Sequence, residues 1–345
     1  MFDKVIVDWF CLINSRGIGP KTFWSLLRMY KTAEEALFRV PEQFPRAKAE
    51  KILKAFDGNI IIATDDYFPK ELRRSTLCPP MLFLRGNKEL LKSQKIAIIG
   101  ARNASANGRS ISSRFGENLS NYLTVVSGMA NGIDTGAHLG ALQGSGNTIA
   151  IVPFSLENVY PKENLNLFKR ISKNGLLVTE VPPHKTPDQG MFSARNRIIA
   201  LMSVGIVVIE ASLKSGTMST AKIALDFGTE VMAVPGSPSD PRSSGCNNLI
   251  KNGAPLVENY TDVLEIIGYK SEIKNEKIAL NDNCSFPNSR SGDIMSLLSV
   301  DSPTNLELIA KSLNMDMQEL LYNISELEIL GKIHKCSSNE VVLNA

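Results

Sequence analysis

Two consecutive strand–glycine–helix units between Lys95 and His138 constrain the fold more than any other feature of the chain. The apolar stretch Lys95–Ile99 runs into Gly100-Ala101-Arg102, and Val125–Ser127 runs into Gly128-Met129-Ala130-Asn131-Gly132. Each unit predicts a buried strand that ends in a tight turn before a helix. In a parallel sheet such turns collect at one edge, where backbone N–H groups can bind phosphate. The phosphate could belong to a nucleotide or to a nucleic-acid backbone.

Four further apolar segments of strand length follow at Thr148–Val152, Leu176–Thr179, Gly205–Glu210 and Glu230–Val234. Segments of helix length separate them, and this alternation predicts a parallel α/β sheet that helices cover on both faces. We assign residues 95–268 to this central domain. Ligands of such sheets bind at the carboxyl ends of the strands, so we expect the informative residues directly after each strand.

The distribution of charge and the use of cysteine limit what the chain can bind. A length of 345 residues predicts two or three domains, and the net charge is only +3. Residues 1–95 contain 17 Lys/Arg and 11 Asp/Glu, residues 96–268 contain 14 and 13, and residues 269–345 contain 7 and 11. The basic N-terminal part is the more plausible neighbour of a polyanion. Five scattered cysteines without a CxxC pair, and only 3 histidines, predict a reducing compartment and no metal. We expect a cytoplasmic protein without a membrane span.

Three segments that follow strands are candidates for an anion-binding site. Arg102 and Gly100 come after the first strand, and Ser127, Gly128, Met129, Ala130 and Asn131 form the turn after the second. Phe192 precedes Arg195 and Arg197, an order that suits base stacking and phosphate contacts. Lys214, Ser215, Gly216 and Thr217 open the helix after the fifth strand. Alternatively, Arg102 makes a salt bridge to a neighbouring loop, Phe192 anchors the core, and one of the other arginines is paired internally.

Two further patterns leave an enzyme open as an alternative. Asp134 and His138 lie four residues apart on one helix face, which would suit an acid/base pair or, more simply, a carboxylate at a helix start and a structural histidine. Glu210, close to Ser215-Gly216-Thr217, would suit an enzyme acting on a nucleoside phosphate. The chain has neither GxGxxG nor a P-loop, and no nucleophile or metal ligand accompanies Asp134. We therefore predict no catalytic residues and no cofactor.

Residues 1–72 read as a small helical domain, and residues 73–94 as a connector that includes a strand. Helices near Val5–Ile13 and Thr22–Met29 flank Arg16-Gly17-Ile18-Gly19-Pro20-Lys21, a pattern similar to a helix-hairpin-helix. The turn either contacts DNA or only provides the geometry of a helical bundle. Arg46, Lys48, Lys51 and Lys54 follow on or near one surface, which is usually a solvated face.

Residues 269–290 are polar and predict a linker. Residues 291–345 show three helical segments and then a strand–turn–strand, which predicts a winged helix. Because this part is acidic, we expect it to bind a protein partner rather than duplex DNA.

The motifs of the central domain, in order, resemble those of the DNA-processing protein DprA (Smf) family. The match comprises Gly100-Ala101-Arg102, Ser127 to Asp134 with Ala137-His138, Tyr160-Pro161, Phe192 with Arg195-Asn196-Arg197, Glu210-Ala211 with Ser215-Gly216, Val234-Pro235-Gly236 and Gly253-Ala254. The resemblance implies an extended Rossmann-like domain, here with an N-terminal helical domain of the SAM or helix-hairpin-helix kind and a C-terminal winged helix. It implies a homodimer that binds incoming single-stranded DNA in natural transformation, protects it and loads the recombinase RecA onto it.

Some positions depart from the pattern of that family. Ser193 stands where proline is common, and Phe154-Ser155 replaces a turn that contains glycine. Gln189 is neutral at a position where a basic residue would help. Thr229 stands where a basic residue is common, which would leave one wall of the DNA pocket without its charge. The alternatives to a recombination mediator are the nucleotide enzyme and a dimeric scaffold for other proteins.

Overall fold

The computed structural model describes residues 3–160, 162–186, 189–269, 289–298, 303–329, 332–337 and 339–343, and a mixed eight-stranded sheet lies within residues 59–233. The chain divides into two compact units, Met1–Tyr269 and Lys270–Ala345. Within the described ranges no helix is both long and apolar enough to cross a bilayer.

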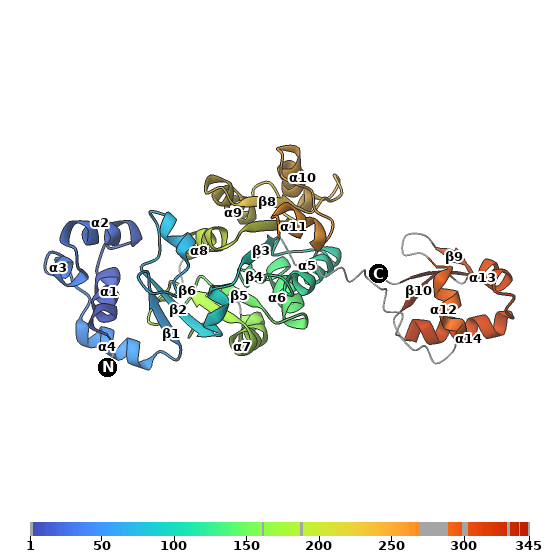
Figure 1. Ribbon diagram of the computed structural model, residues 1–345, viewed down its shortest axis with the longest axis horizontal. Coiled ribbons are helices and arrows are strands. Elements are labelled where there is room, and N and C mark those ends of the chain that lie inside the picture. The colour runs from blue at the N-terminus through green and yellow to red at the C-terminus, as the bar shows by residue number, and fades with distance from the viewer. Residues whose placement is uncertain are drawn as a thin grey trace. The chain divides into compact units, whose positions relative to one another are not determined.

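The sheet of the first unit has the strand order β1-β2-β6-β5-β4-β3-β7-β8 (Figure 1). The strands are β1 (Asn59–Ile62), β2 (Met81–Gly86), β3 (Lys95–Gly100), β4 (Thr124–Ser127), β5 (Thr148–Ile151), β6 (Leu176–Thr179), β7 (Gly205–Ile209) and β8 (Glu230–Ala233). All six strands predicted between residues 95 and 268 form, and they are parallel. β2 pairs antiparallel with β6, and β1 pairs antiparallel with β2, so the sheet also includes segments that precede residue 95.

Successive side chains of β3 point to opposite faces of the sheet, and apolar residues on both faces explain why helices cover both. Ile96 and Ile98 pack into one apolar cluster with Phe115 and Ala137, whereas Ala97 and Ile99 pack into the cluster on the other face. The helices that follow the strands are α5 (Ala106–Leu119), α6 (Ile133–Gln143), α7 (Leu165–Asn174), α8 (Gln189–Met202), α9 (Gly216–Asp226), α10 (Ser244–Lys251) and α11 (Tyr260–Ile266). The predicted α/β class with a parallel sheet is confirmed.

Small residues let α5 and α6 approach closely on one face. A Cβ atom on Gly140 would lie 1.9 Å from the carbonyl oxygen of Ser113, so only glycine fits there. Side chains fix the starts of several helices, as when Ser105 accepts a hydrogen bond from the N–H of Gly108 at 2.8 Å. The position of α5, and hence of the turn that carries Arg102 before it, is thereby defined.

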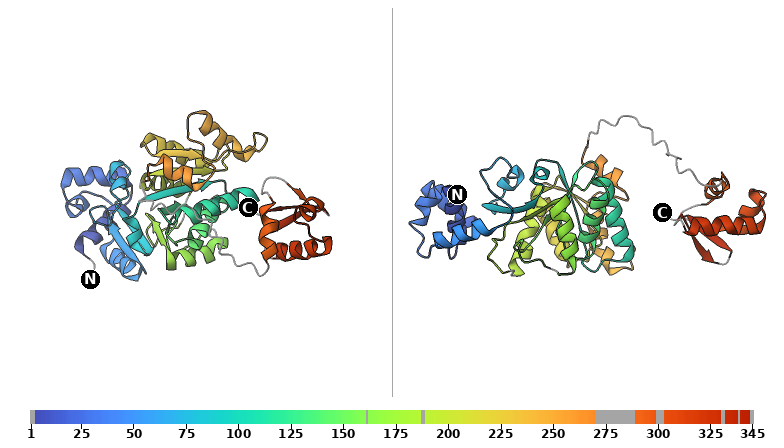
Figure 2. Two further views of the ribbon diagram at one scale, coloured as in Figure 1. Left: turned by 45° about the vertical axis from the view of Figure 1, so that its right-hand side comes forward. Right: turned by 90° about the horizontal axis from the view of Figure 1, so that it is seen from below.

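Four helices precede the sheet: α1 (Lys4–Asn14), α2 (Pro20–Tyr30), α3 (Ala33–Leu37) and α4 (Arg46–Ala55). Figures 1 and 2 show them beside β1 and β2, at one end of the sheet. Phe10, Phe23 and Leu53 are fully buried among them. Phe10 also contacts Phe83 of β2 edge-on, so this predicted helical domain packs directly against the sheet.

The second unit contains α12 (Ser289–Ser296), α13 (Leu306–Ser312), α14 (Met317–Ile329) and an antiparallel sheet of β9 (Thr304–Asn305), β10 (Ile333–Ser337) and β11 (Glu340–Leu343). Ile294, Leu320 and Ile324 are fully buried in its core. The short strand β9 was not predicted. The winged helix remains a prediction, and most of the predicted linker 269–290 lies outside the described residues.

Candidate functional site

Two adjoining cavities open at the carboxyl ends of the parallel strands, the edge of the sheet that the sequence singles out. The aromatic hollow, about 250 Å³, is lined by Arg102, Asn103, Gly128, Met129, Ala130, Asn131, Pro153, Phe154, Tyr160, Phe192 and Arg195. The polar hollow, about 470 Å³, is lined among others by Gly100, Ala101, Arg102, Asn196, Ser212, Ser215, Gly216, Thr217 and Arg242. Arg102, Phe192 and Arg195 line both cavities, so the two form one continuous depression.

Arg102 and Phe192 stand where the two hollows meet. The Arg102 guanidinium carbon lies 5.5 Å from the centroid of the Phe192 ring, and Tyr160 packs edge-on against that ring at 6.0 Å. Arg102 is exposed, and within the described part of the chain it makes no ion pair. Phe192 is only half-buried, so the core-anchor alternative does not hold, and the described residues offer no partner for the salt-bridge alternative. A cation next to two accessible aromatic rings is suited to a base and its phosphate.

Arg195 lies beneath this pair as a buried support. Its Nη1 donates hydrogen bonds of 2.6 Å to the carbonyl oxygens of Gly128 and Ile151, which joins the ends of β4 and β5. Burial lowers the pKa of Arg195 to about 10, although the nearby Asp134 acts in the opposite direction. A Cβ atom on Gly128 would lie 1.9 Å from Nη1 of Arg195, which explains the glycine at the end of β4.

The structure separates Arg197 from the other candidate residues. Arg197 lines a different cavity, between α8 and the N-terminal helices, and its Nη1 and Nη2 each donate a 2.6 Å hydrogen bond to Glu180. Its Nε donates to the carbonyl of Leu77. Internal pairing, the alternative that the sequence left open for one arginine, therefore applies to Arg197.

Asp134 and His138 do not form an acid/base pair. The Asp134 carboxylate accepts hydrogen bonds from the N–H groups of Gly128 and Ala130, at 3.2 and 3.3 Å. His138 is fully buried, and its Nδ1 lies 2.7 Å from the hydroxyl oxygen of Thr148. Burial lowers the pKa of His138 to about 3, so the ring is neutral. Since Asp134 already occupies two N–H groups of the predicted anion cradle, that turn is less open to phosphate than its sequence suggests.

The start of α9 is more open than the Gly128 turn. α9 begins at Gly216 without a side-chain cap, and Ser215, Gly216 and Thr217 line the polar hollow. The Thr217 hydroxyl donates to the carbonyl of Gly100 at 3.0 Å, which holds the turns after β7 and β3 together. The Ser215 hydroxyl oxygen is buried and has no hydrogen-bond partner among the described residues. Lys214 is exposed beside this turn and does not line the hollow.

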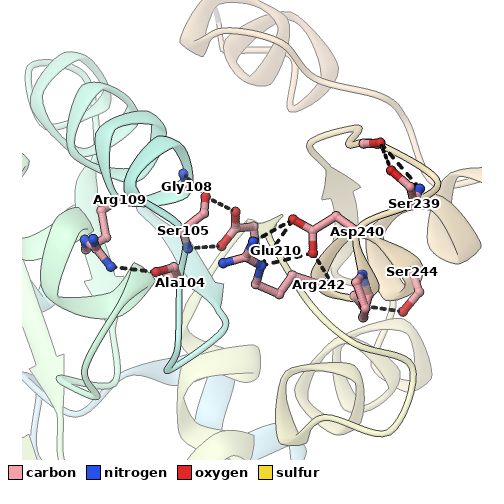
Figure 3. A network of polar contacts seen from close by, with 11 residues as sticks. Ala104, Ser105, Gly108, Arg109, Glu210, Ser239, Asp240, Arg242 and Ser244 are labelled. Carbon is pink, nitrogen blue, oxygen red and sulfur yellow. Dashed lines mark hydrogen bonds and ion pairs between the residues drawn. The ribbon is translucent and has the colours of Figure 1, made fainter.

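Sequence reasoning missed the structural role of Glu210, which Figure 3 shows between Ser105 and Arg242. Glu210 has a φ of 51° at the end of β7, and its carboxylate accepts bonds from the N–H of Ser105, at 2.8 Å, and from the Ser105 hydroxyl. It thus fixes the start of α5. With both oxygens occupied by Ser105, the feature that favoured a nucleotide enzyme has a structural explanation.

Arg242 is a second residue that the sequence did not single out. It follows β8 and lines the polar hollow, and Asp240 holds its guanidinium through Nε and Nη2 at 3.0 and 2.9 Å. The negative charge of Glu210 acts on it as well. The available signal, an Asp-Pro-Arg sequence after a strand, is weak because such a sequence is also an ordinary helix start.

Other candidate positions serve the frame of the site. Ser127 is buried and donates to the carbonyl of Ile98 at 2.6 Å, and Met129 is buried with a φ of 57°. Thr229 immediately precedes β8, so it lies at the amino edge of the sheet. The expectation that Thr229 forms a wall of the pocket is wrong. The side chain of Gln189 lies outside the described residues.

Comparisons with known proteins extend over most of the first unit. A family profile described as DNA recombination-mediator protein A matches residues 59–268, and one described as a DprA-like N-terminal HHH domain matches residues 3–60. The DNA processing protein DprA of Streptococcus pneumoniae is 42% identical over 200 residues, 58% of this chain and 71% of that protein. DprA of Bacillus subtilis is 35% identical over 267 residues, 76% of this chain and 89% of that protein.

Solved structures of DprA proteins have the same fold. The crystal structure of S. pneumoniae DprA superposes with a TM-score of 0.68 at 32% identity and covers 75% of this chain and 96% of that one. A structure of DprA from Helicobacter pylori, reported for its single-stranded DNA binding mode, superposes with a TM-score of 0.56 at 28% identity. It covers 62% of this chain and 96% of the other.

Proposed function

This chain belongs to the DNA recombination-mediator protein A family, and from that premise we propose that it binds single-stranded DNA at the carboxyl edge of its sheet. One observation carries the assignment to this edge. Arg102, exposed and unpaired among the described residues, lies over the half-buried ring of Phe192 at the meeting point of the two hollows. Cationic and aromatic groups together bind a strand without reading its sequence.

The two hollows would bind different parts of one nucleotide. A base fits the aromatic hollow, where Phe192 and Tyr160 offer ring faces and edges. A phosphate fits the polar hollow, near the start of α9, with Arg102 and Arg242 as cations. Gly100, Ser127, Gly128, Met129 and Arg195 would shape the site rather than contact the phosphate, and Arg197 would stay outside it.

We extend the proposal to the steps that follow binding. The bound strand would be protected and passed to RecA in the cytoplasm during natural transformation, by a homodimer formed through the central domain. The family description as a recombination mediator supports this role, and the resemblance in motifs supports the partner. Filament formation by RecA on the oligonucleotide, with and without this protein, would test the transfer, and sedimentation would test the dimer.

Fluorescence anisotropy with labelled oligo-dT tests the binding site. The affinity should fall steeply with salt, and Arg102→Ala should weaken binding and reduce the slope of log K against log[salt] by about one unit. Lys173→Ala, at the C-terminal end of α7 and thus at the amino edge, is the matched control and should change neither. An unchanged affinity in Arg102→Ala would refute this location. Strong competition by a nucleoside monophosphate would favour the nucleotide enzyme instead.

A further inference from the structure

In the helix-hairpin-helix-like turn of the N-terminal domain, Arg16, Gly17 and Lys21 are exposed, whereas the residues between Gly17 and Lys21 are partly buried. Ile18, Gly19 and Pro20 line a cavity of about 200 Å³ whose opposite wall includes Pro182 and Met191 of the central domain. Pro20 occupies the first turn of α2, where it provides no N–H group. Arg16 is held by Glu42 at 3.0 Å. Part of the turn that the sequence made a candidate for DNA contact therefore faces the central domain.

A different surface of the same domain combines cations with aromatic rings. Nζ of Lys48, on α4, lies 5.3 Å from the centroid of the Phe44 ring, and that ring contacts His184 at 5.1 Å. His184, in the loop after β6, is exposed, as is Lys185 beside it. Burial lowers the pKa of His184 and the positive charges of Lys185 and Lys48 add to the effect, so both lysines lie near its neutral ring.

Lys51 and Lys54 extend this surface along α4. Both are exposed, and the i+3 spacing from Lys48 to Lys51 to Lys54 keeps neighbouring ammonium groups on adjoining parts of the helix surface. We call Lys48, Lys51, Lys54, Lys185 and the rings of Phe44 and His184 the α4 surface. Within the described residues, none of its four lysines takes part in an ion pair.

Two carboxylates, one on α1 and one directly after β6, are engaged in ion pairs. Asp8 pairs with Arg46, and Glu180 pairs with Arg197. Glu50 lies on α4 among the lysines, and its negative charge, which also helps to raise the pKa of the buried Cys11 thiol, offsets one of the four lysines. The lysines therefore retain a net positive field that a polyanion could use.

The strand order aligns the α4 surface with the site proposed above. At the carboxyl edge the order β7-β3-β4-β5-β6 places, in sequence, the start of α9, Arg102, the turn at Gly128, Tyr160 and finally His184. Neighbouring strands are about 4.8 Å apart, so this row spans about 19 Å. At its end the ring of His184 contacts Phe44, which precedes α4. The candidate phosphate site, the aromatic rings and then Lys48 thus succeed one another along the edge, and α4 carries Lys51 and Lys54 on toward β1.

We propose that the α4 surface is a second contact for the same strand of single-stranded DNA, which continues from the aromatic hollow past Tyr160 onto α4. The lysines would take backbone phosphates, and the rings of His184 and Phe44 would stack on bases. This inference rests on the proposed function, because it needs a strand at the carboxyl edge. It assigns the DNA contact of the N-terminal domain to α4, next to the loop after β6, whose Lys185 also lines the cavity at the hairpin turn.

Anisotropy of the full chain with oligo-dT of two lengths, about 6 and about 30 nucleotides, separates the two contacts. The triple variant Lys48→Ala/Lys51→Ala/Lys185→Ala removes three exposed lysines. It should lower the affinity for the long oligonucleotide at least 10-fold and reduce its salt slope by about two units, since each phosphate contact contributes about 0.7 for single strands. The short oligonucleotide should bind as before. The matched control Lys169→Ala/Lys173→Ala/Lys222→Ala removes exposed lysines from α7 and α9 and should change neither affinity.

Three outcomes would overturn the proposal, and they are distinguishable from one another. An unchanged affinity of the triple variant for the long oligonucleotide would leave these lysines to another partner, such as an acidic protein, while binding of the short oligonucleotide would keep the proposed function intact. An equal loss for both lengths would place the lysines in the main site. Failure of the unmodified protein to bind either length would refute the proposed function and this surface together.

Discussion

The arginines near the site show how burial and pairing decide what a residue can do. Arg102 is exposed over an aromatic ring, Arg195 is buried on two carbonyl oxygens, and Arg197 is bound to a carboxylate. A guanidinium that already donates to buried acceptors cannot turn to a ligand without leaving those acceptors unsatisfied, which costs about 1–3 kcal/mol for each. Among these three arginines, replacement of Arg102 should therefore lower the affinity for DNA most and the stability of the fold least.

At the same scale, His138 predicts a pH dependence of stability. Its pKa is about 3 in the folded protein, against 6.5 for an unperturbed ring, so the stability contributed by the neutral ring is fully present above pH 6.5. That contribution is lost as pH falls below 6.5, by at most about 1.4 kcal/mol per pH unit. Between pH 7.5 and pH 5, the free energy of unfolding should fall by about 2 kcal/mol more in the unmodified protein than in His138→Gln, as measured by urea unfolding.

The raised pKa of the buried Asp134 favours its protonated form, so Asp134 changes stability with pH in the opposite sense. Because Asp134 is present in both proteins, the difference between the unmodified protein and His138→Gln reports the histidine. Equal losses of stability in the unmodified protein and in His138→Gln would contradict the buried neutral ring.

At the scale of elements, α8 connects two regions with different roles. Phe192 and Arg195 are three residues apart and line the two hollows, whereas Met191, Ala194 and Arg197 share the face toward the N-terminal helices. The same helix start therefore positions the proposed base site and anchors the helical domain. Changes on one face should be separable from changes on the other.

Glu180→Gln tests that separation. It would leave the Arg197 guanidinium, only 9% exposed, without its anionic partner, and breaking a buried ion pair costs about 3–5 kcal/mol. Thermal unfolding should show a clear loss of stability, whereas the oligo-dT affinity of the folded protein should stay within about twofold. A large loss of affinity at a temperature where the variant is folded would mean that Arg197 belongs to the site after all.

Local sequence pattern predicted the strands and the turn residues well, because each depends on neighbours in the chain. The two glycine turns, Arg102 and Phe192 were all found in this way. The pattern could not distinguish Arg195 from Arg197, because their different partners, Ile151 and Glu180, are set by strand order rather than by spacing. It could not show that Asp134 occupies N–H groups of the Gly128 turn, nor that Arg242 and Arg102 line one cavity. Thr229 was wrongly expected in the pocket for the same reason, because only the direction of β8 in the sheet places Thr229 at the amino edge.

At the scale of the whole molecule, charge and structure divide the chain in a consistent way. The hollows and the α4 surface belong to the first unit, which includes the basic residues 1–95, and the second unit is acidic. We therefore propose that the second unit binds a protein partner and contributes little to the affinity for DNA.

Removal of the second unit tests this division. A chain of residues 1–269 retains every residue of both hollows and of the α4 surface. Its affinity for long oligo-dT should match that of the full chain within about threefold at equal salt. A loss of affinity of more than 10-fold, with the shortened chain still folded by circular dichroism, would assign DNA binding to the second unit as well.

We propose that the carboxyl edge of the sheet holds a single strand of DNA, with a base in the aromatic hollow. A crystal structure with a short oligo-dT tests it most directly. We expect a thymine against Phe192 and Tyr160, the adjoining phosphate beside Arg102, and hydrogen bonds from the first turn of α9 in the polar hollow. A strand bound elsewhere, or at this edge with its bases turned away from Phe192 and the aromatic hollow empty, would contradict the account.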